Sequence, residues 1–486
     1  MLNTSFFKLN RIPILLTVLS VLFYTSFAYD LLRTDYIKLI SLYIGLFFLF
    51  YKLVQISKHN LKFLTWIAFG FRAVFLLAIP NLSQDFYRFI WDGRMILEGL
   101  NPYLFTVESL ISNNGFPVAQ AQELYKGMGS LNAGHFTNYP PINQLCFTIA
   151  GLFAGKSILG SVFVMRLLII AADFGALYFG QKLLKKLNLP EYNIFWYILN
   201  PFIIIELTGN LHFEGVMIFF LVWSLYLLHS GKWKWAAVVL ALSISVKLIP
   251  LLFLPLFYQW FMRRNVIANN VKQSVSKEGI TSSLPPRNDV LRMAKLITFY
   301  TIIGIITLLL FAPFYSSEFI NNYTETVALW FQNFEFNASL YYVAREVGYL
   351  FRGYNEIAVI GKVIPLVVIL FVLILTFFRK NKTTTELVTA MLLALSFYFF
   401  TTTTVHPWYI ATLLALSVFT KYKFPLVWSF VIILSYLAYI NINKADKSEN
   451  LWIIGLEYLV VYGVFIWEVF IKNSSSSQLD FVRKNN

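Results

Sequence analysis

Long apolar runs recur along nearly the whole chain and are separated by short polar connections. A membrane-spanning helix needs about 20 mostly apolar residues, and the runs that reach or approach this length predict about 13–14 spans. They are 13–29, 37–55, 62–80, 158–180, 193–207, 213–229, 234–248, 249–262, 294–313, 357–378, 385–403, 407–420, 425–441 and 451–471. Several are short, which suggests tilted helices packed around a cavity. These runs are too long and continuous for barrel strands, so we expect an all-α polytopic membrane protein.

Composition agrees with this pattern. The 486 residues are 58% hydrophobic and 13% charged, whereas soluble domains carry about 25% charged residues. The net charge is +15, but an excess of Lys and Arg in a membrane protein usually marks cytoplasmic loops and anionic lipid head groups. No basic stripe lies on a soluble face, so a nucleic-acid partner is not expected. A single cysteine, Cys146, excludes a disulfide framework and a multi-cysteine metal site.

The basic residues also predict an orientation. Nine of them lie between spans that would share one side of the membrane, namely Lys58, Lys62, Lys182, Lys185, Lys186, Lys232, Lys234, Arg379 and Lys380. The basic, Ser- and Pro-containing segment 263–293 is predicted to be a cytoplasmic linker between transmembrane regions 1–262 and 294–486. The acidic loops 81–140 and 314–356 then lie outside, and both termini lie in the cytoplasm. We expect an inner (plasma) membrane location.

Two segments leave alternatives open. The first run has a basic flank and resembles a signal peptide, but its length and the spans after it favour an uncleaved first helix. Residues 142–155 are apolar, yet the charge pattern leaves no room for a full span between the outer residues 140–141 and the inner residues 185–186. We therefore interpret 142–155 as a re-entrant or membrane-surface helix.

The first outer loop carries the best candidates for chemistry. On a helix, Asp85, Arg88 and Asp92 share one face. A carboxylate there could take a proton from an acceptor hydroxyl, and the alternative is a surface helix with an internal Asp–Arg salt bridge. Tyr139 is held by the prolines that follow it, so it either lines a site or belongs to a structural turn.

Further polar residues occur at the outer ends of later spans. His212 and Glu214 could bind a metal or substrate hydroxyls, although two ligands at this spacing are a weak metal signal and a capped helix start is the alternative. Lys247 contradicts the positive-inside trend, so it either neutralises a phosphate or extends idly to the interface.

The second half of the chain adds three candidates on the same predicted side. Asn337 and Arg345 follow an aromatic stretch of a kind that often forms an interface belt. His406 precedes Pro407-Trp408-Tyr409 and could donate to a phosphate oxygen, or belong to an ordinary interfacial cluster. Scattered salt bridges would have no reason to share one side with the candidates of the first half. The coincidence predicts one outward-facing site.

The same residues carry a family resemblance. Residues 85–94, Asp-Phe-Tyr-Arg-Phe-Ile-Trp-Asp-Gly-Arg, with Gly-Leu-Asn-Pro-Tyr at 99–103, resemble the first outer loop of GT-C glycosyltransferases, in particular bacterial polyprenyl-phosphate-mannose-dependent mannosyltransferases. Later blocks are similar too: Tyr139-Pro140-Pro141, Asn200-Pro201, His212-Phe213-Glu214, Lys247 with Pro250, Asn337-Ala338-Ser339 and His406-Pro407-Trp408-Tyr409. Glu214 stands where the family pattern has Asp, and 263–293 looks like an insertion.

The resemblance implies a reaction and roles for the residues. Asp85 would be the general base, with Asp92 and Arg88 orienting it or binding acceptor. Lys247, Arg345 and His406 would face the leaving phosphate, and Tyr139, His212, Glu214 and Asn337 would complete the substrate site. The donor would be a polyprenyl-phosphate sugar, with mannose implied by the family alone, and the acceptor a glycan or lipid. No cofactor is expected, and the residues suggest no metal site although the superfamily varies in this respect.

Three other classes of membrane protein are alternatives to a glycosyltransferase. A transporter or flippase would show internal repeats and polar groups near the bilayer midplane, whereas the polar residues here cluster at outer ends. A lipid-linked glycan polymerase or ligase would rely on arginines more than on an Asp-led helix. A membrane scaffold would leave Asp85, Asp92 and Lys247 without a purpose.

Overall fold

The computed structural model describes residues 4–263, 287–332, 334–443 and 449–472. Within these ranges the chain is helical, and its one β-bridge is an isolated parallel contact between Phe336 and Thr404. The predicted all-α, polytopic membrane fold is confirmed. Residues 264–286, most of the predicted cytoplasmic linker, lie outside the described residues, and helix α14 already begins at Arg287.

Seven helices in the described residues are long and apolar enough to cross a membrane, or eight if one bent pair counts as a span. They lie in α1 (Thr4–Tyr29), α2 (Tyr36–Ser57), α8 (Ile158–Lys186), α14 (Arg287–Phe311) with η4 (Ala312–Phe314), α17 (Ile357–Phe378), α18 (Thr384–Thr401) and α21 (Leu451–Ile466) with η7 (Trp467–Ile471).

The remaining apolar runs are shorter or broken, which is why full-length spans are fewer than the 13–14 runs suggested. Prolines account for part of this, because proline lacks the N–H that a continuing helix needs. Pro250 and Pro255 lie in a 3-10 segment, and Pro407 begins another. The pieces are α3 (Leu61–Val74), η1 (Glu191–Ile194), α9 (Phe195–Ile198), α12 (Trp233–Val246), η3 (Ile249–Leu256), α13 (Phe257–Met262), η5 (Pro407–Tyr409), α19 (Ile410–Ser417), α20 (Phe424–Val431) and η6 (Ile432–Asn443).

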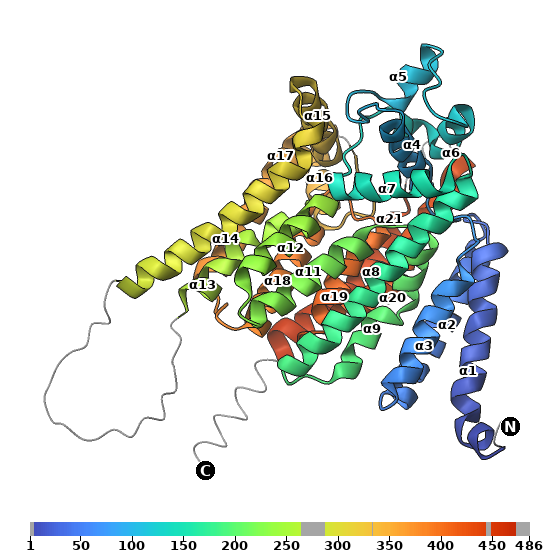
Figure 1. Ribbon diagram of the computed structural model, residues 1–486, viewed down its shortest axis with the longest axis vertical. Coiled ribbons are helices and arrows are strands. Elements are labelled where there is room, and N and C mark those ends of the chain that lie inside the picture. The colour runs from blue at the N-terminus through green and yellow to red at the C-terminus, as the bar shows by residue number, and fades with distance from the viewer. Residues whose placement is uncertain (1–3, 264–286, 333, 444–448, 473–486) are drawn as a thin grey trace, which may run out of the picture.

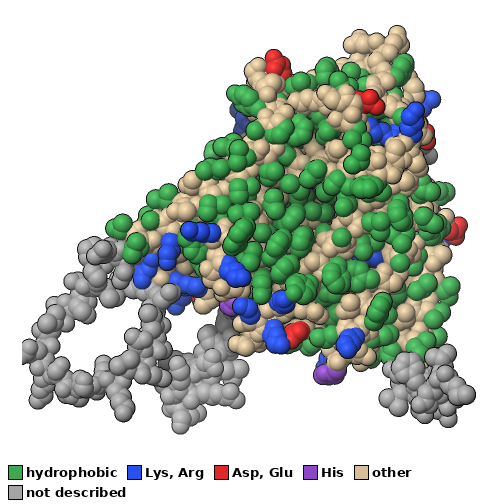
Figure 2. All heavy atoms as spheres, in the orientation of Figure 1, with side chains coloured by type: hydrophobic (Ala, Val, Ile, Leu, Met, Phe, Trp, Pro, Cys, Tyr) green, Lys and Arg blue, Asp and Glu red, His purple; other side chains and the backbone are tan. Residues whose placement is uncertain are grey.

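The long helices form a slanted bundle with the helices of both outer loops at one end (Figure 1). The first loop contributes α4 (Asp85–Leu97), α5 (Val107–Ser112), α6 (Ala121–Ala133) and α7 (Pro141–Ala154), and the second contributes α15 (Ser317–Gln332) and α16 (Leu340–Arg352). Figure 2 shows a wide band of hydrophobic side chains across the middle of this face, with Lys and Arg gathered mainly at the opposite end. Such a band is the surface that a bilayer covers.

Helix α7 is the segment that the sequence left open. Its 14 residues extend about 21 Å at 1.5 Å per residue, which is short of the roughly 30 Å hydrocarbon core. It runs across the end of the bundle (Figure 1), and Leu152 and Phe153 are exposed. Its length and placement agree with a membrane-surface or re-entrant helix.

One span is broken close to the predicted site. Helix α10 (Pro201–Ile203) continues as η2 (Ile204–Gly209), and α11 (Glu214–His229) follows at an angle of 115°. The guanidinium of Arg166 donates to the carbonyls of Thr208 at 2.8 Å and Gly209 at 2.9 Å. Backbone groups freed by a break must find partners inside the protein, because lipid offers none. The break leaves residues 210–213 between the two helices and starts a new helix at Glu214.

The two halves of the chain pack on one another directly. Tyr43 donates its hydroxyl to the carbonyl of Ser429 at 2.6 Å, and the Asn200 side-chain amide donates to the hydroxyl of the same serine at 3.0 Å. All three residues are buried. Segments from both halves can therefore contribute to one site.

Candidate functional site

Asp85 is the first residue of α4 and is half-buried. The side-chain amide of Asn132 donates to its Oδ1 at 3.0 Å. Burial raises the pKa of the Asp85 carboxyl, and the Asn132 hydrogen bond and the positive charges of Lys247 and Arg33 act against this rise. The negative charge of Glu214 raises it further. Asp85 therefore lies at the centre of a group of charged residues from distant parts of the chain.

Arg88 and Asp92 form a buried ion pair, with 2.8 Å between Nε and Oδ1. Arg88 also donates to the carbonyls of Asn132 at 2.6 Å and His135 at 3.0 Å. The second oxygen of Asp92 accepts from the Gln144 amide at 3.1 Å. The internal salt bridge left open by the sequence does form, but inside the protein, where it holds α4 against α7 and the end of α6.

Glu214 and Lys247 form an ion pair where α11 begins and α12 ends. The carboxylate is buried, whereas 28% of the lysine side chain is exposed. The ammonium group also lies over the Tyr409 ring, 4.4 Å from its centroid. Lys247 is thus held in one place by a carboxylate and a ring, unlike a lysine that extends freely to the interface.

The Trp408 ring is stacked with both His212 and His406. The Trp408 ring stacks on His212 with centroids 3.7 Å apart and on His406 with centroids 4.6 Å apart. His212 Nε2 lies 3.8 Å from the Glu206 carboxylate. Burial, helped by the charge of Lys247, lowers the pKa of His406 to about 3. At neutral pH His406 is therefore an uncharged hydrogen-bonding group.

The isolated β-bridge brings the second outer loop to this stack. Phe336 donates its N–H to the carbonyl of Thr403 at 3.1 Å and accepts from the N–H of Val405 at 2.9 Å. Its ring stacks on His406 with centroids 5.2 Å apart. Residues 336 and 406 thus meet because the two loops pair along their backbones.

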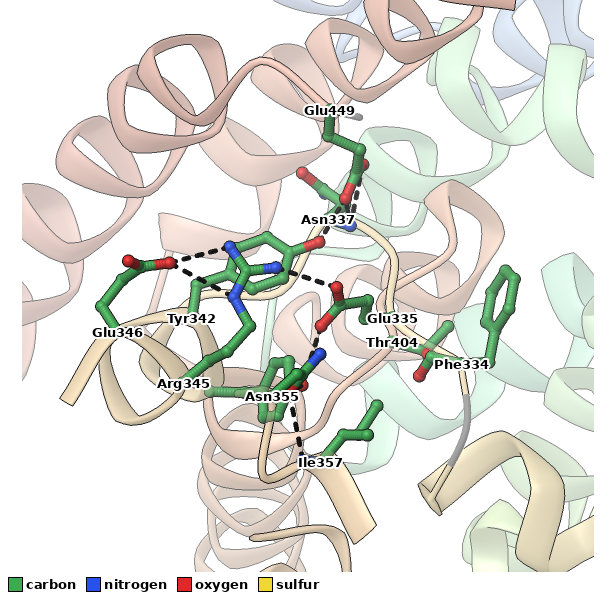
Figure 3. A network of polar contacts seen from close by, with 11 residues as sticks. Phe334, Glu335, Asn337, Tyr342, Arg345, Glu346, Asn355, Ile357, Thr404 and Glu449 are labelled. Atoms are coloured by element: carbon green, nitrogen blue, oxygen red, sulfur yellow. Dashed lines mark hydrogen bonds and ion pairs between the residues drawn. The ribbon is translucent and has the colours of Figure 1, made fainter. Parts of the chain in front are cut away.

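Figure 3 shows where the other two candidates of the second half lie. Arg345 contacts the carboxylates of Glu335 at 2.8 Å and Glu346 at 3.0 Å. Asn337 is buried, and its N–H donates to the Glu449 carboxylate at 3.0 Å. These contacts hold the second loop together and fasten it to the start of α21. Among the described residues, Arg345 and Asn337 make these contacts within the second loop and with Glu449, so their predicted substrate roles stay predictions.

Tyr139 lies close to Asp85. Its ring packs edge-on against Phe89 and Phe147, with centroid distances of 5.0 and 5.6 Å. Burial raises the pKa of its hydroxyl well above the usual range, and the negative charge of Asp85 adds to the shift. The structure brings Tyr139 near the candidate base, where its ring packs on one residue of α4 and one of α7.

The sequence did not single out Arg33, which lies in the connection between α1 and α2. Its guanidinium lies 3.9 Å from the centroid of the Tyr439 ring and donates to the carbonyl of Leu82 at 3.3 Å. The reasoning that singled out Lys247 could also have found Arg33, because both are basic residues at the predicted outer end of a span. Its contact with η6, some four hundred residues away, is not visible in the sequence.

The charged and aromatic side chains of the candidate site come from several elements. In the part of the chain that the structure describes, no three His, Cys, Asp or Glu side chains are grouped so that they could hold a metal ion. Cys146 is buried and free. What the site offers is one accessible carboxylate, two cations, neutral histidines and several aromatic rings.

Comparison with known proteins identifies a family. A family model described as alpha-(1->6)-mannopyranosyltransferase, N-terminal domain, matches residues 17–263. The chain belongs to this family. The resemblance to mannosyltransferases noted in the sequence is thereby confirmed. The matched region contains Arg33 and every candidate from Asp85 to Lys247, whereas Asn337, Arg345 and His406 lie beyond it.

Two curated relatives are more distant. Over 195 residues the chain is 22% identical to alpha-(1->6)-mannopyranosyltransferase A of Mycobacterium tuberculosis, which covers 40% of this chain and 36% of the relative. It is 23% identical over 198 residues to alpha-(1->6)-mannopyranosyltransferase B of Corynebacterium glutamicum, covering 39% and 31%. The chain therefore matches about a third of the length of these relatives.

Proposed function

We propose that this protein is a membrane α-(1→6)-mannosyltransferase that takes mannose from a polyprenyl-phosphate donor and attaches it to a glycan or lipid acceptor. One observation carries the proposal besides family membership. Asp85 is the α4 carboxylate that remains accessible, because Asp92 is buried in its ion pair with Arg88. The proposal therefore gives Asp85 the role of general base, and gives Asp92 and Arg88 the role of positioning α4.

The reaction follows from these roles. The Asp85 carboxylate accepts the proton of an acceptor hydroxyl as its oxygen attacks the anomeric carbon of the sugar. The bond between that carbon and the phosphate oxygen breaks, and its electron pair leaves with the polyprenyl phosphate. A single displacement on a β-linked donor gives an α-linked product. Burial of Asp85 favours this chemistry, because a carboxyl with a raised pKa is a stronger base.

The leaving phosphate needs groups that stabilise its negative charge. Lys247 supplies a fixed ammonium group beside Tyr409. Uncharged His406 supplies a hydrogen bond, and Trp408 keeps its ring in place. A site near the membrane surface has a lower dielectric than water, which strengthens such contacts.

The proposal places this chemistry outside the cytoplasm, in the plasma membrane. Helices α4–α7 lie at the end of the bundle opposite the main gathering of Lys and Arg (Figure 2). Turns at that basic end meet one another, since Lys186 donates to the Ser230 hydroxyl at 2.9 Å and Arg263 to the Lys382 carbonyl at 3.0 Å. Basic loops usually stay on the cytoplasmic side, so the candidate site would face outward and both termini inward.

The test is release of polyprenyl phosphate from polyprenyl-phosphate-mannose by the purified protein in nanodiscs, with a panel of glycan and lipid acceptors. Linkage analysis of the product reports whether the new bond is α-(1→6). We expect turnover by the wild type and a loss of at least about a hundredfold in Asp85→Asn, which keeps the shape and removes the base. Asp30→Asn is the matched control, because Asp30 is an exposed carboxylate in a nearby loop.

Three outcomes would change the proposal. Turnover that survives Asp85→Asn would keep the enzyme class and remove Asp85 as its base. Turnover only with other lipid-linked sugars would replace mannose. If no donor were bound or consumed, a transporter or flippase would become the better explanation of the outward-facing polar cluster.

A further inference from the structure

Arg33 is held beside the start of α4 by its own hydrogen bond and by contacts of residues just before it in the chain. The side-chain amide of Asn81 donates to the carbonyls of Phe27 at 2.7 Å and Leu31 at 3.2 Å. Arg33 itself donates to the carbonyl of Leu82. The α1–α2 connection is therefore fastened to the residues immediately before Asp85.

Arg33 also stands at one end of a row of rings, here called the aromatic row, that crosses the candidate site. Its guanidinium lies over Tyr439, whose centroid is 6.4 Å from that of Phe336. Phe336 stacks on His406, and His406 meets Tyr409 edge-on at 5.3 Å. Lys247 lies over Tyr409 at the other end. The aromatic row thus has one cation at each end, and both cations act on the charge of Asp85.

The two cations differ in what remains available to a ligand. Lys247 shares its charge with the Glu214 carboxylate, although 28% of its side chain remains exposed. None of the ion pairs formed by the described residues includes Arg33, and its guanidinium donates one hydrogen bond, to the Leu82 carbonyl. A guanidinium has five N–H donors in a planar fork that matches the oxygens of a phosphate. The half-buried Arg33 therefore keeps most of its donors, and all of its charge, for an anion.

We propose that Arg33 binds the phosphate group of the polyprenyl-phosphate donor, opposite Lys247 across the aromatic row. This inference rests on the proposed function, and it adds Arg33 to the phosphate contacts of Lys247 and His406 in place of Arg345. Arg345 is held by Glu335 and Glu346 (Figure 3), so its charge is already compensated. Arg33 and Asp85 form no direct ion pair in the structure, which suits a site where substrate lies between a base and a cation.

The test is direct binding of farnesyl phosphate, without any sugar, to the full chain in phosphatidylcholine nanodiscs. Farnesol and inorganic phosphate are measured in parallel to separate the lipid from the anion. We expect Arg33→Gln to weaken farnesyl phosphate binding by about tenfold or more, because charge-assisted contacts to phosphate are among the stronger hydrogen bonds. Farnesol binding should not change. Arg352→Gln is the matched control, since Arg352 is an arginine of the second outer loop whose side chain is 68% exposed.

A second variant keeps the result interpretable if Arg33→Gln destabilises the protein. Arg33→Lys keeps the charge and loses the planar fork, so we expect intermediate affinity with unchanged thermal unfolding. Equal farnesyl phosphate affinity in wild type, Arg33→Gln and Arg33→Lys would overturn the proposal. Inorganic phosphate that displaces farnesyl phosphate with the same affinity would overturn the lipid assignment.

The outcome is separable from that of the proposed function. Binding that depends on Arg33, in a protein that transfers no mannose, would support the phosphate site and count against the mannosyltransferase proposal. Mannose transfer by Arg33→Gln with normal donor affinity would support the mannosyltransferase proposal and count against the phosphate site at Arg33.

Discussion

Lys247 forms an ion pair with Glu214 at the point where α12 ends and α11 begins. Glu214 lies in the first turn of its helix, where the helix dipole favours a negative charge. The pair therefore ties two helix ends together and sets the position of the lysine beside Tyr409. The carboxylate at position 214 therefore contributes to the site through the lysine that it positions.

We expect Lys247→Met to affect stability and activity in different ways. The substitution leaves the buried Glu214 carboxylate unpaired, which destabilises a protein far more than losing an exposed pair. The double variant Lys247→Met with Glu214→Gln removes that charge, so its melting temperature should lie above that of Lys247→Met. Mannose transfer should fall by about tenfold or more in both, roughly 1.4 kcal/mol of transition-state stabilisation.

Lys38→Met is the matched control, because Lys38 pairs with an exposed aspartate, Asp30. Lys38→Met should change neither the melting temperature nor mannose transfer. If the double variant recovered activity together with stability, Lys247 would be a structural residue and its proposed role at the phosphate would be wrong.

The pH dependence of transfer should report on Asp85. A general base works in its ionised form, so activity falls as the pH drops through the pKa of Asp85, which burial raises above its usual 3.8. Asn132→Ala removes the hydrogen bond that lowers this pKa, so the acid limb of kcat/KM should move to higher pH. Profiles of wild type, Asn132→Ala and the exposed-site control Asn113→Ala would check this. An acid limb at the same pH in all three would argue against Asp85 as the base.

The Arg88–Asp92 pair should behave as a structural contact. Asp92→Asn leaves a buried guanidinium without its counter-charge, and breaking such a pair costs about 3–5 kcal/mol. We expect a clear drop in the temperature of unfolding, with early proteolysis of loop 81–140. Asp289→Asn, in an exposed pair with Arg292, should change neither the unfolding temperature nor the proteolysis of this loop. If Asp92→Asn were fully stable but inactive, Asp92 would have to take part in the reaction itself.

The sequence could predict the helices and the face on which the first three candidates lie. Periodicity was enough to place Asp85, Arg88 and Asp92 along one side of α4. It could not show what packs over that side. The partners of Arg88 and Asp92 are carbonyls of Asn132 and His135 and the Gln144 amide, which come from the other end of the loop and from α7. An accessible carboxylate and a buried one therefore look alike in the sequence.

The site as a whole depends on contacts between distant segments. His406 meets Phe336 because two loops pair along their backbones, and Arg33 meets Tyr439 because the first connection packs against η6. Backbone pairing and ring contacts of this kind leave no local pattern. Among the described residues, fewer single helices are long and apolar enough to span a membrane than there are apolar runs, since an apolar run does not reveal where its helix breaks.

The break before Glu214 gives the last prediction. Arg166 is buried and donates to three carbonyls, those of Thr208, Gly209 and Leu76. Arg166→Met removes all three bonds, and each buried acceptor left without a partner costs about 1–3 kcal/mol. We expect a lower unfolding temperature and, because His212 and Glu214 follow the break directly, a parallel loss of transfer. Arg166→Lys should restore little, since an ammonium group cannot reproduce the planar fork, and exposed Arg352→Met should match the wild type. If Arg166→Met unfolded at the wild-type temperature, the broken span would have to be held by other contacts, such as the Arg72–Asp173 pair.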